Sequence, residues 1–174
     1  TVPTYALISE SFQNWKGMED SGVRRIKREI RIDVRSIAFV TPELLDSISV
    51  RTHVAKWLSE NNEDIEGLRN GGTTSLTNLG AFRAYMVEYL RNHPHIDSMM
   101  PVMVRDMPPT ESGMPVEIYC FSKINSWVPF ESVQSSVVDF AYAVVGQFGL
   151  KLFQSPSGTD LEALRSVTNQ NHKI

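Results

Sequence analysis

Hydrophobic and polar residues alternate most regularly between residues 24 and 35, in the stretch RRIKREIRIDVR. The apolar members of this alternation, with one interruption at Arg28, are Ile26, Ile30, Ile32 and Val34. A period of two residues is typical of a strand with one buried and one exposed face. The sequence therefore predicts a strand whose charged side chains face water.

Two helices, a hairpin and a last strand are predicted after this first strand. Apolar residues recur at three- and four-residue spacings after Thr77 and again after Pro129, and Pro94 and Gly149 end the two patterns. The runs MMPVMVRDMP and MPVEIYCFS, joined through PTESG, are typical of a hairpin. The run LKLFQ at 150–154 predicts the last strand.

The order of these elements is βαββαβ once the segment 41–76 is set aside. Thr41 followed by Pro42 is a helix start signal, and the apolar spacing beyond it predicts one or two helices inserted after the first strand. We therefore expect an α+β fold of the ferredoxin-like kind, with an antiparallel four-stranded sheet and two helices on one face. That arrangement carries many functions and decides none of them.

The composition indicates an ordinary soluble globular chain, with 174 residues, 41% hydrophobic and 21% charged. No run approaches the roughly 18 apolar residues that a membrane span needs. The single cysteine, Cys120, excludes an intrachain disulfide, and we expect a small buried hydrophobe in a reduced, cytoplasmic setting. Because the chain begins at Thr1 within strand-like sequence, we expect a piece of a longer protein.

The basic stretch raises the question of nucleic-acid binding. Residues 24–35 carry six Lys or Arg and two acids, a charge of +4, while the remaining chain carries −7. Alternating signs weaken the field that a phosphate would feel, and a nucleic-acid domain usually shows a basic field over a whole face. Tyr119 and Phe121 share a strand face with Glu117, but the first strand adds no aromatic ring for base stacking. We expect no nucleic-acid partner.

Catalytic and metal-binding patterns are weak. His93 and His95 flank Pro94, yet no cysteine or carboxylate pair stands beside them at ligand spacing. No serine lies in a nucleophile elbow, and GGTTS lacks the lysine of a phosphate loop. We therefore expect no enzymatic activity, no metal and no cofactor. Five methionines near the hairpin (99, 100, 103, 107, 114) fit core filling and a contact surface equally well.

Several ungapped stretches resemble a known family in consecutive order. They are VPTYALISESFQNW, SGVRRIKREIRIDVRSI, LTNLGAFRAYMVEYLRNHP, VRDMPPTESGMPVEIYCF and FGLKLFQSPSG. Together they resemble the carboxy-terminal cytoplasmic part of bacterial MscS-type mechanosensitive ion channels, and most closely the miniconductance branch. The resemblance extends from Thr1 to about residue 158.

The resemblance implies a division of the chain. Residues 1–21 would end the small β domain below the membrane, with Phe12 and Trp15 in contact with a neighbouring subunit. Residues 22–158 would form the ferredoxin-like vestibule domain, with 41–76 as the insertion typical of the miniconductance branch. Residues 159–174 would form a C-terminal helix or tail. The family's membrane helices and pore residues lie upstream of this chain.

The resemblance also implies a function. The parent protein would lie in the bacterial inner membrane as a tension-gated channel for osmotic protection, with this part on the cytoplasmic side. Seven copies would enclose a hollow vestibule that supports assembly, modulates gating and admits ions and small solutes. Arg25, Lys27 and Arg31 would face the vestibule and bias which ions collect there. The alternative is a soluble ferredoxin-like ligand-binding or regulatory module without channel activity.

Overall fold

The computed structural model describes residues 22–155, which form one sheet and five helices. The elements are β1 (Arg24–Ile32), the 3₁₀ turn η1 (Val34–Ser36), α3 (Pro42–Ser49), η2 (Thr52–Val54), α4 (Ala55–Glu60), α5 (Asn62–Arg69), α6 (Asn78–Asn92), β2 (Met103–Asp106), β3 (Met114–Ser122), α7 (Trp127–Val145) and η3 (Gly146–Phe148). The predicted α+β class is confirmed.

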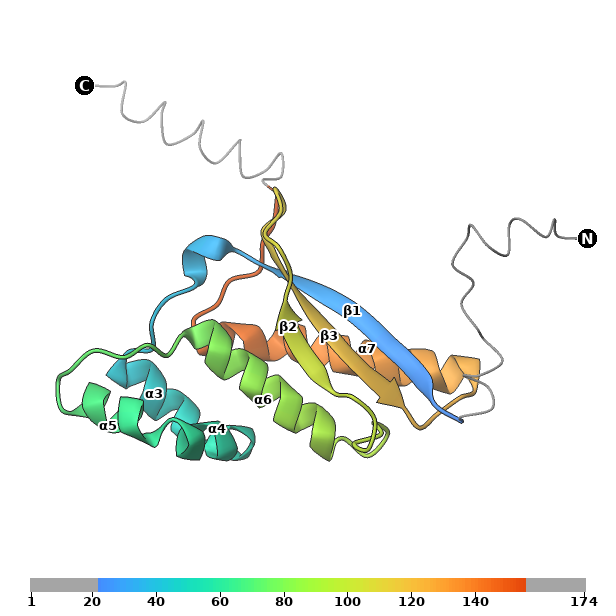
Figure 1. Cartoon of the computed structure of the whole chain (residues 1–174). Helices are drawn as coiled ribbons and strands as arrows, with labels where there is room; N and C mark the ends of the chain where they lie inside the picture. Colours follow the sequence, from blue (N-terminus) through green and yellow to red (C-terminus); the bar gives the residue numbers. More distant parts are fainter. Residues whose placement is uncertain (1–21, 156–174) are drawn as a thin grey trace, which may run out of the picture.

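The sheet has three antiparallel strands in the order β1, β3, β2, so β3 lies in the middle (Figure 1). The register places Glu117 of β3 opposite Glu29 of β1 and opposite Arg105 of β2. The predicted hairpin is therefore confirmed as β2 and β3.

The strand predicted at 150–154 is reduced to a single antiparallel bridge between Leu152 and Ile32. Two backbone bonds flank this bridge, from the Asp33 N–H to the Lys151 carbonyl and from the Phe153 N–H to the Arg31 carbonyl, each 2.8 Å long. The segment meets only the last residues of β1, which is too short a stretch to build a ladder. A four-stranded sheet is thus not formed within the described residues.

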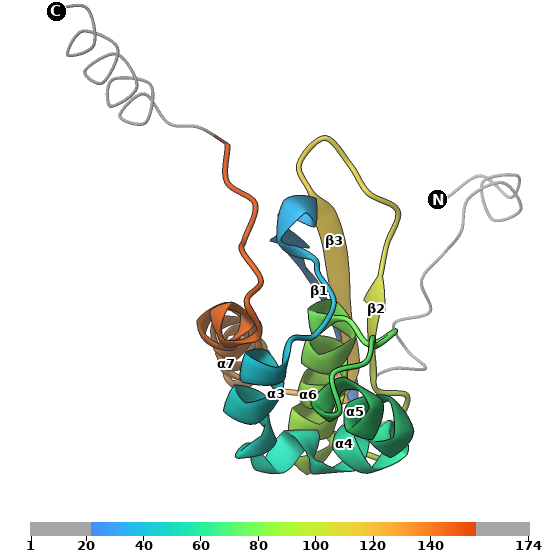
Figure 2. The same cartoon turned by 90° about the vertical axis from the view of Figure 1, so that its left-hand side faces the viewer.

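Helices α6 and α7 lie side by side on one face of the sheet (Figures 1 and 2). The residues between sheet and helices are fully buried or nearly so, and include Ile26, Ile30, Ile32, Val116, Ile118, Cys120, Phe82, Met86, Val137, Ala141 and Phe148. The alternation predicted for the first strand places its isoleucines in this core. The other face of the sheet carries no described helix, and we call it the open face.

The first strand ends earlier than predicted. The Asp33 carboxylate accepts a hydrogen bond from the Arg35 backbone N–H and pairs with the Arg35 guanidinium, which turns the chain into η1. Val34 is therefore 48% exposed rather than part of the apolar face. The prediction that Val34 and Arg35 continue the strand was wrong because alternation carries no signal for this local cap.

The inserted segment forms three short helices, α3, α4 and α5, where one or two were predicted (Figure 2). The Thr41 hydroxyl accepts a hydrogen bond from the Leu44 N–H, which confirms the predicted start of α3. The Asn61 side chain donates to the Trp57 carbonyl at 2.7 Å and marks the break between α4 and α5. The buried apolar residues of these helices pack onto the same core as α6.

The insertion leaves and rejoins the framework at adjacent points. The Val40 N–H donates to the Leu76 carbonyl at 2.9 Å, and Phe39 bridges Thr77. The buried Asn78 amide accepts from the Ala38 N–H and donates to the Ser36 carbonyl. These bonds close the neck of the insertion at the start of α6.

The two long helices begin close to their predicted starts. The apolar pattern of α6 starts after Thr77, and the Thr77 hydroxyl accepts from the Gly80 N–H, so Thr77 caps the helix. Helix α7 begins at Trp127, two residues before Pro129, and Gly149 adopts φ 70° after its end. In the described part of the chain, no helix combines the length and the apolar character needed to cross a membrane.

Candidate functional site

The open face gathers most of the charge of the sheet. Alternation and register place Arg25, Lys27, Glu29 and Arg31 of β1 beside Glu117, Tyr119 and Phe121 of β3, with Met103 and Arg105 of β2 on the other side. All three basic residues predicted for a vestibule face, Arg25, Lys27 and Arg31, therefore lie together on this surface. Four cations and two carboxylates leave it with a charge of +2.

Glu117 connects basic residues from the two outer strands on the open face. Its side chain is only 5% exposed, and its carboxylate joins Arg105 at 2.7 Å and Lys27 at 3.3 Å. Burial alone would raise the pKa of Glu117, but the hydrogen bonds and charges of Arg105 and Lys27 outweigh it and hold the pKa below its usual value. Glu117 therefore stays ionised and links all three strands through their side chains.

The remaining cations differ in how strongly they are neutralised. Arg31 pairs with Glu29 at 2.9 Å, and both side chains are about half exposed. Arg25 makes no ion pair with any residue between 22 and 155. The field of the predicted charge face is therefore weaker than its composition indicates, and Arg25 is its least compensated cation.

The two aromatic rings of the open face contact each other. Tyr119 and Phe121 meet edge to face, with centroids 5.5 Å apart and planes at 83°. Met103 lies opposite Tyr119 on the neighbouring strand. Rings arranged at right angles do not offer two parallel surfaces for consecutive bases. The absence of a nucleic-acid partner stays a prediction.

Two other candidate residues from the sequence, Cys120 and His93, are packed against other side chains of the fold. Cys120 is fully buried, and burial raises the pKa of its thiol to about 12. His93 packs edge-on to Tyr89, which stacks on Phe140 of α7 with centroids 3.8 Å apart. Burial and the nearby His95 lower the pKa of His93. Among the described residues, no three His, Cys, Asp or Glu side chains gather as a metal site.

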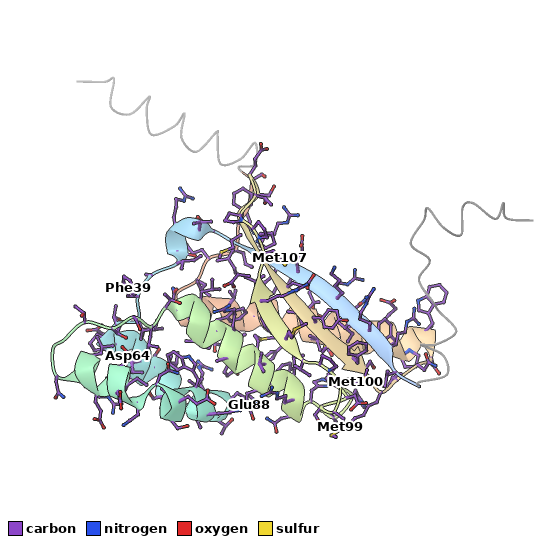
Figure 3. The ribbon with its side chains drawn as sticks, viewed as in Figure 1. Phe39, Asp64, Glu88, Met99, Met100 and Met107 are labelled. Atoms are coloured by element: carbon purple, nitrogen blue, oxygen red, sulfur yellow. The ribbon has the colours of Figure 1, made fainter. Side chains whose placement is uncertain are left out.

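The methionines of the predicted cluster are divided between two ends of the sheet (Figure 3). Met99 and Met100 lie in the loop after α6, and Met99 is 92% exposed, while Met107 lies in the turn after β2. They form neither one contact patch nor one core cluster. Phe12 and Trp15, the predicted subunit contact, lie outside the described residues.

A shallow groove between α4 and α6 was not predicted. It has a volume of about 150 Å³, an apolar floor at Trp57, Ala84 and Val87, and a charged rim. The rim residues are Lys56, Glu60, Glu88 and Arg91, with His53 at one side. The charges at three- and four-residue spacings on the two helices were the available signal, but only the fold brings the helices together.

Arg105 was also missed, because only the hairpin register shows that it faces Glu117. A scan of the chain against models of known protein families finds no match.

Proposed function

We propose that this chain is the cytoplasmic vestibule domain of an MscS-type mechanosensitive channel of the miniconductance branch. The observation that carries the proposal is the position, within the fold, of the stretches that resemble this family. Within the described residues they cover β1, α6, the β2–β3 hairpin and the segment after α7. The inserted helices α3, α4 and α5 carry none of them. Helix α7 carries none either, so the likeness lies on the three strands, on α6 and on the segment after α7. A likeness of this kind is expected when a family shares a framework and varies an insertion.

The same proposal gives the sheet its ferredoxin-like form. If the segment 150–154 acts as the fourth strand, the order becomes 150–154, β1, β3, β2, with all neighbours antiparallel. The bridge between Leu152 and Ile32 supports this position. Two helices on one face then complete the βαββαβ pattern, with α3, α4 and α5 as an insertion after β1.

In the intact parent protein, seven such domains would surround a vestibule below the inner membrane. Residues 1–21 would belong to the β domain, with Phe12 and Trp15 against the next subunit. A head-to-tail contact between identical subunits builds a closed ring when the rotation between neighbours closes. The mass of the detergent-solubilised parent protein tests this directly, since seven copies are expected and a monomer would contradict the ring.

The open face would line the vestibule and act on passing ions. Arg25 has the least compensated charge, so Arg25→Glu in the parent channel should shift the reversal potential in a salt gradient toward cations. Arg91→Glu is the matched control of equal charge change, because Arg91 lies on α6 at the rim of the groove and not on the open face. Equal effects of both variants, or none, would refute this orientation of the sheet.

The coding region upstream of Thr1 tests the channel proposal at the level of the whole protein. Several hydrophobic spans of about 20 residues are expected, and the last should be rich in small residues. A start codon close to Thr1 would exclude the channel.

A soluble ligand-binding module is the second candidate, and the groove between α4 and α6 is the observation that favours it. Its apolar floor and mixed-charge rim suit a small amphipathic molecule. A thermal-shift screen of the chain with small metabolites tests this candidate. A hit lost in Trp57→Ala and kept in Trp127→Ala would support it, because Trp127 is exposed outside the groove.

A further inference from the structure

The outer edge of β1, on the side away from β3, carries backbone groups that point out of the sheet. Their direction follows from the two bonds that this edge makes. The Arg31 carbonyl accepts from the Phe153 N–H, and the Asp33 N–H donates to the Lys151 carbonyl. Both bonds lie on the side of β1 opposite β3. The N–H and C=O groups of one residue point to one side of a strand, and the side alternates from residue to residue.

The same alternation fixes the direction for the rest of β1. The N–H and C=O groups of Arg25, Lys27 and Glu29 point outward like the Arg31 carbonyl, whereas those of Ile26 face β3. No residue between 22 and 155 bonds the outward groups of these three residues. Six backbone groups in a row therefore form an open edge, which is the surface on which a further strand can be added.

Charge decides which strand fits this edge. Arg25 and Lys27, whose backbone groups point outward, also place their side chains on the open face. A second copy of β1 would bring like charges together, because this strand carries five basic residues and one acid. An acidic strand meets complementary charge instead.

We propose that the outer edge of β1 binds an extended acidic segment of a partner protein, which adds to the sheet as an antiparallel strand. The pairing continues the direction already taken by residues 151–153. The inference stands on described residues alone and does not depend on the channel role.

The geometry specifies the sequence of the added strand. Residues opposite Arg25 and Lys27 have side chains on the open face and backbone groups that bond β1, so these two positions are acidic. The residue opposite Glu29 is uncharged. The residues between them point to the helix side, where α7 packs against β1, and are apolar. The resulting probe, from its amino end, is acetyl-Thr-Val-Glu-Val-Glu-Val-amide.

Fluorescence anisotropy with the labelled probe and the 174-residue chain separates strand addition from charge attraction. N-methylation of the two Glu nitrogens removes bonds to β1 without changing charge and should weaken binding about tenfold or more, at about 1 kcal/mol for each lost bond. N-methylation of the Val nitrogens, which point away from β1, should leave binding within about threefold. Equal loss with both peptides, or no binding of the unmodified probe, overturns the proposal.

Hydrogen exchange in the same chain identifies the edge. The amides of Lys27 and Glu29 should exchange rapidly alone and slowly with the probe, while the Ile26 amide is protected in both cases. Arg25→Glu should weaken binding of the probe about tenfold. The remote control Arg91→Glu on α6 should not. If the Lys27 and Glu29 amides are already protected in the dilute chain alone, another segment or a second copy occupies the edge and the proposal is wrong.

Discussion

Replacing Glu117 by Gln removes the charge that joins the three strands while keeping the size of the side chain. Lys27 and Arg105 would lose their shared carboxylate, but both can turn to water, since their side chains are 53% and 50% exposed. A hydrogen bond to a charged group contributes about 1.5–3 kcal/mol, and exposed ion pairs contribute about 0.2–1 kcal/mol. With two half-exposed partners, we expect the free energy of unfolding to fall by about 1–2 kcal/mol in total.

Urea denaturation of the chain at pH 7 measures this loss. The matched control is Glu29→Gln. Glu29 lies directly opposite Glu117 in the register but is half exposed, and among residues 22–155 it pairs only with Arg31. Its effect should stay within about 0.5 kcal/mol, as for most exposed ion pairs. If Glu117→Gln lowers the free energy of unfolding no more than Glu29→Gln does, Glu117 does not hold the sheet together.

The pH dependence gives a second test of the same residue. The pKa of Glu117 is lowered in the folded chain, so the ionised form stabilises folding. This contribution is fully present above the unfolded pKa, near 4.5, and is lost as the pH falls through the lower folded pKa. The stabilities of the native chain and of Glu117→Gln should therefore converge in acid. A difference that does not shrink as the pH falls below 4.5 would contradict the assignment.

Three further substitutions or reactions test the packing. Asn78→Ala should lower the free energy of unfolding, measured by urea denaturation, by about 2–3 kcal/mol, because two backbone groups lose their buried amide partner. An unchanged free energy of unfolding would show that Asn78 does not hold the neck of the insertion closed. Gly113→Ala should lower the melting temperature more than Gly71→Ala does. Both glycines have φ above 80°, but of the two only a Cβ at Gly113 would meet a backbone oxygen, that of Ile32, at 2.5 Å. The thiol of Cys120 should react with a disulfide reagent only on unfolding, because it is fully buried with a pKa of about 12; rapid native-state labelling would refute this.

The elements with strong periodic patterns could be predicted from the sequence. Alternation identified β1, and three- and four-residue spacings identified α6 and α7, with Pro94 and Gly149 close after their ends. Local bonds explain the errors. The Asp33 carboxylate ends β1 early, and the segment 150–154 is apolar enough for a strand but meets only the end of its neighbour.

The open face could be predicted only in part. Alternation placed Arg25, Lys27 and Arg31 on one surface, but the field of this surface depends on pairings between strands. Glu117 lies 90 positions after Lys27 in the chain, and Arg105 joins it only through the hairpin register. A count of charges along the sequence contains no information on these contacts.

We propose that this chain belongs to a tension-gated channel, and current recordings from the full-length parent protein test this proposal most directly. Membrane patches from bacterial cells that lack other mechanosensitive channels should show discrete currents that open with suction when the parent protein is present. Arg25→Glu should change their ion preference and Arg91→Glu should not. Patches with confirmed parent protein in the membrane and no tension-activated current would contradict the account.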